Sequence, residues 1–202
     1  MSFRNGTADN CVTTLGKITD LFLTGVDDFE AQHVDVFDDV LCGLIEKIER
    51  EAVAELSRDV AELPKAPRTL SRRLARHDDI EVAGPVLRRS VVLNESDLIE
   101  VAQNKSQLHL EAIANRAHVS ERVSDILIDR GNSTVLCTVA GNAAARFSTR
   151  GYRTLLDQAK SNANIASALV GRSDLSPEMF RKLVAQASAD VKKMLADQIV
   201  VE

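Results

Sequence analysis

The chain has 202 residues, of which 45% are apolar and 27% are charged, and its formal net charge at pH 7 is −5. Nine glycines and four prolines are few for the turns of many short strands, so an all-helical chain fits better than a strand-rich fold. Because only 3% of the residues are aromatic, the core must be aliphatic.

Cysteine usage and hydropathy bear on the compartment. Cys11, Cys42 and Cys137 contain no CxxC pair, so neither a zinc site nor a disulfide framework is indicated. The N-terminus is polar, and no uninterrupted apolar run reaches the ~20 residues that span a bilayer. We therefore expect a cytoplasmic protein without a membrane segment, metal or cofactor.

Charge is distributed unevenly between two parts of the chain. Residues 1–63 carry 5 basic and 14 acidic side chains, whereas residues 64–202 carry 20 basic and 16 acidic side chains. Such asymmetry is typical of an interaction surface, and it equally suits an acidic part that lies against a basic part. We expect an acidic N-terminal helical extension or cap over 1–63, followed by a helical repeat array over 64–202.

Two helices are predicted in the N-terminal part, after a loose segment at residues 1–10. Apolar residues three or four apart predict a short helix over 12–23 that Gly25 ends, with Asp27 or Asp28 as the next N-cap. A second apolar stripe of helical period predicts a long amphipathic helix over 30–63. Since a helix cannot bury such a stripe alone, it either caps the first repeat or forms a homodimer through the N-terminal helices.

From residue 64 onward the sequence predicts short helices that recur in pairs. Similar tetrapeptides close successive segments: LARH, VAQN, IANR, VAGN and LVGR. Segment ends at residues 77, 104, 130, 160 and 188 give a two-helix unit of roughly 26–30 residues. Asn94 with Asp97 forms a capping-box pattern, Ser120 and Ser176 are N-cap candidates, and Pro177 suits a first helical position. Glycines mark the segment ends near residues 131, 151 and 171.

Paired short helices that cannot bury their apolar sides alone predict an all-α solenoid. The blocks LARHDDIEVAGPVLRRS, IANRAHVSERVSDILIDRG and LVGRSDLSP resemble an alphaproteobacterial domain-of-unknown-function family, number 2336. The resemblance covers roughly residues 12–187 and implies HEAT-like helical repeats. It implies no catalytic residue, cofactor or substrate.

One basic cluster is a candidate binding surface. Lys65 precedes six arginines, and the first of these, Arg68, is four residues from the next on one helix face. The six are Arg68, Arg72, Arg73, Arg76, Arg88 and Arg89. They favour docking of an acidic protein partner, and the alternative is nucleic acid bound through phosphate contacts. A sequence pI near 5.5 and few aromatic residues make nucleic acid the weaker reading.

Other polar residues point to structural roles. The four histidines form no HExxH or paired i, i+4 arrangement, and no glycine loop fits a phosphate site. Cys42 and Cys137 lie in apolar helical segments, which favours buried structural thiols. Arg116, Arg130 and Arg172 recur at repeat ends, where they form either a ladder of bonds to neighbouring carbonyls and carboxylates or an anion-binding row. We expect a non-enzymatic protein-interaction module or scaffold.

Overall fold

The protein is all-helical in the part that the structure describes. The computed structural model describes the backbone of residues 5–199 and the side chains of residues 11–194 and 196. Thirteen helices and no strand occur in this range, and one isolated bridge pairs Val119 with Ala145. The predicted all-α fold of short packed helices is confirmed. None of the described helices is both long enough and apolar enough to cross a bilayer.

The chain forms two compact units, residues 1–101 and residues 102–202. The expected boundary at residue 63 lies inside the first unit. The helices of the first unit are α1 (Asn5–Gly25), α2 (Ala31–Leu44), α3 (Arg50–Val60), α4 (Arg68–Ala75), α5 (Ile80–Arg89) and most of α6 (Glu95–Asn104). The second unit holds α7 (Gln107–Ala114), α8 (Glu121–Arg130), α9 (Ser133–Gly141), α10 (Thr149–Ala159), α11 (Ala163–Val170), α12 (Pro177–Gln186) and α13 (Ala189–Ile199).

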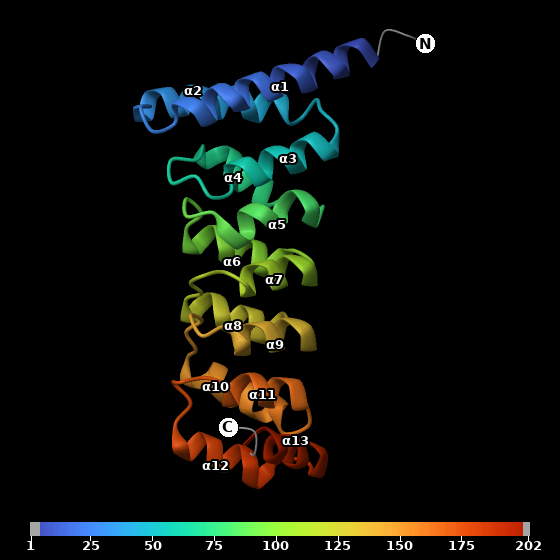
Figure 1. Ribbon diagram of the computed structural model, residues 1–202, viewed down its shortest axis with the longest axis vertical. Helices are drawn as coiled ribbons and strands as arrows, with labels where there is room; N and C mark the ends of the chain where they lie inside the picture. The colour runs from blue at the N-terminus through green and yellow to red at the C-terminus, as the bar shows by residue number, and fades with distance from the viewer. Residues whose placement is uncertain (1–4, 200–202) are drawn as a thin grey trace. The chain divides into compact units, whose positions relative to one another are not determined.

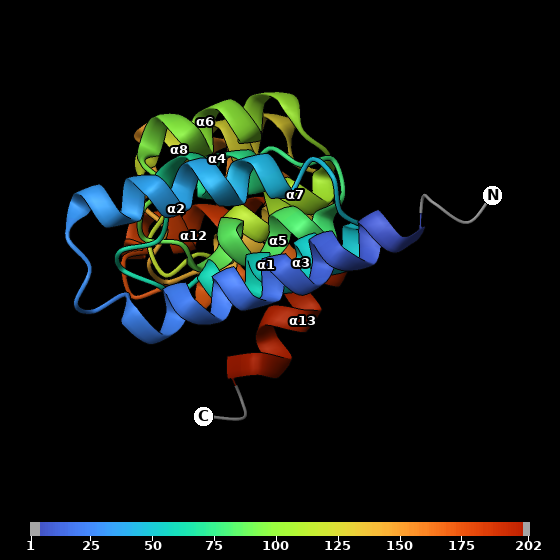
Figure 2. The ribbon, with the colours of Figure 1, turned by 90° about the horizontal axis from the view of Figure 1, so that it is seen from above.

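In the first unit, helices pack both on neighbours in the chain and on helices two positions away. The helix α1 lies beside α2, and α3 beside α4, as successive layers (Figure 1). Seen from above, α1 runs along α3 while α2 lies next to α4 (Figure 2). The side chains of Phe22, Leu41, Leu56 and Leu70 are fully buried in these contacts. Each layer thereby covers the apolar side of the next, which is how a helical repeat builds one core.

The single helix predicted over 30–63 is wrong, because the chain turns between α2 and α3. A turn at Ile45–Glu49 separates them, and Glu49 is the N-cap of α3. The two halves of the stripe face different neighbours. Asp38 of α2 accepts hydrogen bonds from α4, whereas the Ser57 hydroxyl of α3 donates to the Val82 carbonyl of α5 at 2.6 Å. Apolar periodicity continued through the turn and therefore did not reveal it.

The other N-terminal predictions are partly corrected. Helix α1 already begins at Asn5, inside the segment expected to be loose, and it ends at Gly25 as predicted. The N-cap of α2 is Glu30 rather than Asp27 or Asp28. The Glu30 carboxylate and the His33 ring form a reciprocal capping box across the first turn, a role that also explains one of the four histidines.

In the second unit, two columns of helices alternate along the chain. Helices α7, α9, α11 and α13 pack in succession, and α8, α10 and α12 form the other column (Figure 1). The first column is buried most completely. Its fully or almost fully buried apolar residues include Ile113, Val135, Val139, Ile165 and Leu169.

The predicted helix boundaries agree closely with the structure. Helices α4, α6, α8, α10 and α12 end within two residues of the predicted segment ends. The hydroxyls of Ser120 and Ser176 accept N-cap hydrogen bonds, and Pro177 begins α12. Asn94 and Asp97 exchange the two bonds of the predicted capping box. Local cap chemistry was therefore readable from the sequence.

A ladder of side chains reaches back from one helix pair to the carbonyls of the preceding pair. Arg130 donates to the Ala102 carbonyl, and the Asn142 amide donates to the carbonyls of Ala114 and Arg116 at 2.8 Å each. Arg172 continues the pattern onto the end of α9. The structural reading of these arginines is confirmed for Arg130 and Arg172, and it extends to an asparagine that the sequence did not single out.

Candidate functional site

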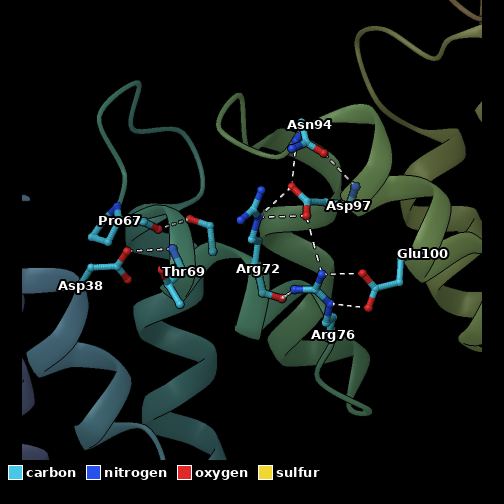
Figure 3. A network of polar contacts seen from close by, with 9 residues as sticks. Asp38, Pro67, Thr69, Arg72, Arg76, Asn94, Asp97 and Glu100 are labelled. Carbon is cyan, nitrogen blue, oxygen red and sulfur yellow. Dashed lines mark hydrogen bonds and ion pairs between the residues drawn. The ribbon is translucent and has the colours of Figure 1, made fainter. Parts of the chain in front are cut away.

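Four of the six arginines predicted as a binding face, Arg72, Arg73, Arg76 and Arg89, form ion pairs with acidic side chains. The Arg72 Nε atom of α4 lies 2.9 Å from Asp97 Oδ1 on α6 (Figure 3). Arg76 donates two hydrogen bonds of 2.5 and 2.7 Å to the Glu100 carboxylate, and its Nη2 atom lies 3.7 Å from Asp97 Oδ1. The Arg76 bond holds the pKa of Glu100 below its usual range. These two arginines therefore join α4 to α6, and their charge is largely compensated.

Asp97 is the centre of this network. It is 6% exposed, and it accepts from Arg72 and from the backbone N–H of Asn94 in the capping box (Figure 3). A buried carboxylate is stable only when cations and N–H donors satisfy it, which these contacts do. The sequence revealed Asp97 as a cap residue but not as the partner of Arg72, because the two are 25 residues apart.

The remaining members of the predicted face divide into paired and exposed side chains. Arg73 binds Glu46 at 2.6 Å and Arg89 binds Glu62 at 2.8 Å, both with acidic residues of the N-terminal part. Lys65 donates to the Asp27 carbonyl at 2.7 Å. Among the described residues, no hydrogen bond or ion pair is formed by the exposed Arg68 and Arg88 side chains. Partner binding by the six arginines stays a prediction. Among the described residues, only Arg68 and Arg88 of the six have side chains without an intramolecular polar contact.

Asp38 is a polar residue that the sequence analysis missed. Its carboxylate is 8% exposed and accepts from the backbone N–H groups of Thr69 and Leu70 at 2.8 and 2.7 Å, so α2 caps the N-terminus of α4 (Figure 3). Cys42 lies one turn further, with its Sγ 3.6 Å from Asp38 Oδ1. Burial, and then the Asp38 charge, raises the pKa of the Cys42 thiol to about 11. The thiol is therefore structural, as predicted, whereas Cys137 is only half-buried.

A groove between α10 and α12 combines apolar and basic side chains within the second unit. Its volume is about 270 Å³. Leu156 of α10 and Met179 and Leu183 of α12 line it as apolar groups, and Arg153 and Lys182 supply positive charge. The remaining lining residues are Thr149, Asp157, Lys160 and Gln186. Asp157 binds Lys160 at 2.6 Å, so the groove keeps a positive balance.

The groove lies where one repeat covers its neighbour less completely. Val123 and Met179 are equivalent residues of two repeats, 56 positions apart, yet Val123 is 1% exposed and Met179 is half-buried. The sequence gives no sign of this difference in burial beyond the change of residue type. A flexible methionine in place of a stiff valine was the one sign of a looser, adaptable surface.

Chemical groups typical of catalysis do not converge in this groove. Its lining contains no histidine or cysteine, and its one carboxylate is held by Lys160. Elsewhere in the described part of the chain, no group of three or more His, Cys, Asp or Glu residues is arranged to hold a metal ion.

Comparison with known proteins gives a family but no characterised relative. Neither the curated proteins nor the solved structures contain a match to this chain. The sequence model of a family described as "Uncharacterised protein conserved in bacteria (DUF2336)" matches residues 82–201. This match covers α6–α13 and nearly all of α5, but not α1–α4, which the resemblance noted above included. Since more than half of its length is matched, the chain belongs to the DUF2336 family.

Proposed function

We propose that the protein is a non-enzymatic module that binds another protein, and that the groove between α10 and α12 takes an acidic, amphipathic segment of that partner. The observation that carries the proposal is the pairing of an apolar floor with a basic rim in one groove. Partner helices commonly place a few apolar anchors in such a groove while their charges meet the rim.

Charge favours an acidic occupant. The exposed Arg153 and Lys182 form no ion pair among the described residues, so they are available to partner carboxylates. Leu156 and Met179 are half-buried and would be covered by one apolar side chain of the partner. Electrostatic complementarity at the rim mainly raises the association rate and selects the partner, whereas apolar contact at the centre supplies affinity.

Charge reversal at the rim tests the proposal. Full-length wild-type protein, an Arg153→Glu/Lys182→Glu variant and an Arg181→Glu/Lys193→Glu control would be used to capture proteins from nuclease-treated native lysate. The control reverses the same number of charges at exposed positions of α12 and α13 outside the groove. We expect a protein that the wild type and the control capture equally and that the groove variant loses at least tenfold.

A direct readout identifies the surface. In protein labelled at methionine methyl groups, the NMR signal of Met179 should shift when the captured protein is added, because Met179 lines the groove. Equal capture by all three proteins, or an unmoved Met179 signal at saturation, would refute the groove as the binding site.

A further inference from the structure

A small cavity lies between α1 and α3 in the first unit, and its chemistry is the opposite of that of the α10–α12 groove. Its volume is about 190 Å³. Leu15 of α1 and Leu56 of α3, both almost fully buried, contribute an apolar wall. Three carboxylates, those of Asp20, Glu55 and Asp59, line the same cavity. An apolar wall with one sign of charge suits a ligand that has both an aliphatic part and a cationic end.

The three carboxylates line one cavity, and the charge of Arg58 only partly offsets their effect on the pKa of Asp59. Among the described residues, none of the three forms an ion pair. Burial, and then the charges of Glu55 and Asp20, raise the pKa of Asp59 above its ordinary value. The negative charges of Glu55 and Asp20 therefore increase the free energy of ionised Asp59, and an incoming cation would relieve that repulsion.

A buried hydroxyl beside the carboxylates is also unsatisfied. Thr19 is 5% exposed, lines the cavity, and its Oγ1 atom has no hydrogen-bond partner in the described structure. Buried polar atoms in native proteins are nearly always paired, and an exception points to a missing partner. The Thr19 hydroxyl adds an acceptor to the carboxylate oxygens that line the cavity.

The lining suits an organic cation better than a metal ion. The three carboxylates do not form a group that could hold a metal, since no such group occurs among the described residues. Arginine presents five donors in a planar fork on an aliphatic stem, which matches several separated acceptors better than a lysine does.

The surroundings of the cavity favour an arginine that belongs to a protein chain. Val12 lines the cavity and is 38% exposed, and Leu21, next to Asp20, is 62% exposed. These apolar groups could be covered by residues that flank the arginine. We propose that the α1–α3 cavity receives an arginine side chain from a partner protein, held by Asp20, Glu55 and Asp59 and by the Thr19 hydroxyl.

The test compares three probes added to isotope-labelled full-length protein and followed by NMR. The probes are a short peptide with one arginine between two leucines, the same peptide with uncharged citrulline in place of arginine, and N-acetyl-arginine amide. We expect saturable shifts of the Thr19 and Asp59 amide signals with the arginine peptide, at least tenfold weaker binding of the free amide, and no saturation with citrulline. Equal binding of arginine and citrulline peptides, or of the peptide and the free amide, would overturn the proposal.

Two variants separate binding from stability. Glu55→Gln/Asp59→Asn should weaken peptide binding at least tenfold, while a matched Asp35→Asn/Asp39→Asn control on α2 leaves it unchanged. Thr19→Val, which keeps the side-chain shape, should weaken binding several-fold without lowering the melting temperature. Unchanged affinity in Glu55→Gln/Asp59→Asn contradicts the proposal. Because the cavity and the α10–α12 groove lie in different units, this result does not depend on the proposed function.

Discussion

Replacing Arg172 with alanine should destabilise the second unit more than any surface substitution, because Arg172 joins three segments at once. Its guanidinium donates to the carbonyls of Asn142, Ala145 and Ala140 at 2.6, 2.9 and 3.3 Å, and its side chain is 2% exposed. Two further bonds of 2.7 Å reach Asp174, and the guanidinium carbon lies 4.5 Å from the centre of the Phe147 ring.

The magnitude follows from these contacts. Hydrogen bonds to a charged group contribute about 1.5–3 kcal/mol each, and removing one partner of a buried pair costs about 3–5 kcal/mol. Asp174 is half exposed, so its share is discounted for solvent, and relaxation around the freed carbonyls recovers part of the rest. We therefore expect Arg172→Ala to lower the free energy of unfolding by ~3–5 kcal/mol.

Urea unfolding followed by far-ultraviolet circular dichroism would measure this loss. Arg172→Lys keeps the charge but not the planar fork, so it should recover only part of the stability. Arg153→Ala, at an exposed position of α10, is the control and should change stability by no more than ~0.5 kcal/mol. A loss below ~1 kcal/mol for Arg172→Ala, or full stability in Arg172→Lys, would refute the clamp.

The remaining predictions concern core packing, pH and thiol reactivity. Leu127→Ala and Leu183→Ala should each cost ~2–5 kcal/mol, because both side chains are fully buried, and thermal melts without a loss would show that neither is a core position. Asp59→Asn should raise the melting temperature at pH 7, because the pKa of Asp59 is raised in the folded protein and ionised Asp59 therefore opposes folding. This destabilisation disappears as the pH falls through the folded pKa and below the ordinary value of 3.8, where Asp59 is protonated in both states. The gain should therefore vanish at pH 3, and a gain that persists there would contradict the sign. Cys42, with a pKa of about 11 and a buried side chain, should react with iodoacetamide at pH 8 at least tenfold more slowly than the half-buried Cys11, as peptide mass spectrometry would show.

Local features of the fold were predictable because short-range chemistry determines them. The hydroxyl caps at Ser120 and Ser176 and the proline at the start of α12 act within one helical turn. The recurring tetrapeptides likewise marked where helices end. These elements required only neighbours in the sequence, which a single chain displays directly.

Features that depend on distant neighbours were not predictable. The turn between α2 and α3 arises because the two helices pack on α4 and α5, and no breaker residue marks Ile45–Glu49. The charges of Arg72, Arg73 and Arg76 read as a free basic face because their acidic partners lie 24–27 residues away. Ion pairs with residues distant in the sequence thus compensate the charge of arginines that the sequence alone presents as an open binding surface.

Gly131 shows how a correct position can have a different cause. The sequence predicts it as the end of a helix, yet its φ of −70° is one that any residue adopts. A Cβ atom there would lie 2.4 Å from the Leu127 carbonyl oxygen and 2.7 Å from Val135 Cγ1. Glycine is required for close approach of α8 and α9, which depends on packing rather than on turn chemistry.

The backward-reaching ladder has a consequence for synthesis of the chain. The carbonyls that Asn142 and Arg172 satisfy precede them by 26 to 32 residues. During translation, each helix pair consequently waits for roughly one further repeat before its exposed ends gain their donors. If the ribosome stalls between repeats, the carbonyls at the ends of the last helix pair lack their side-chain donors. We therefore expect chaperones or proteases to bind the most recently synthesised helix pair.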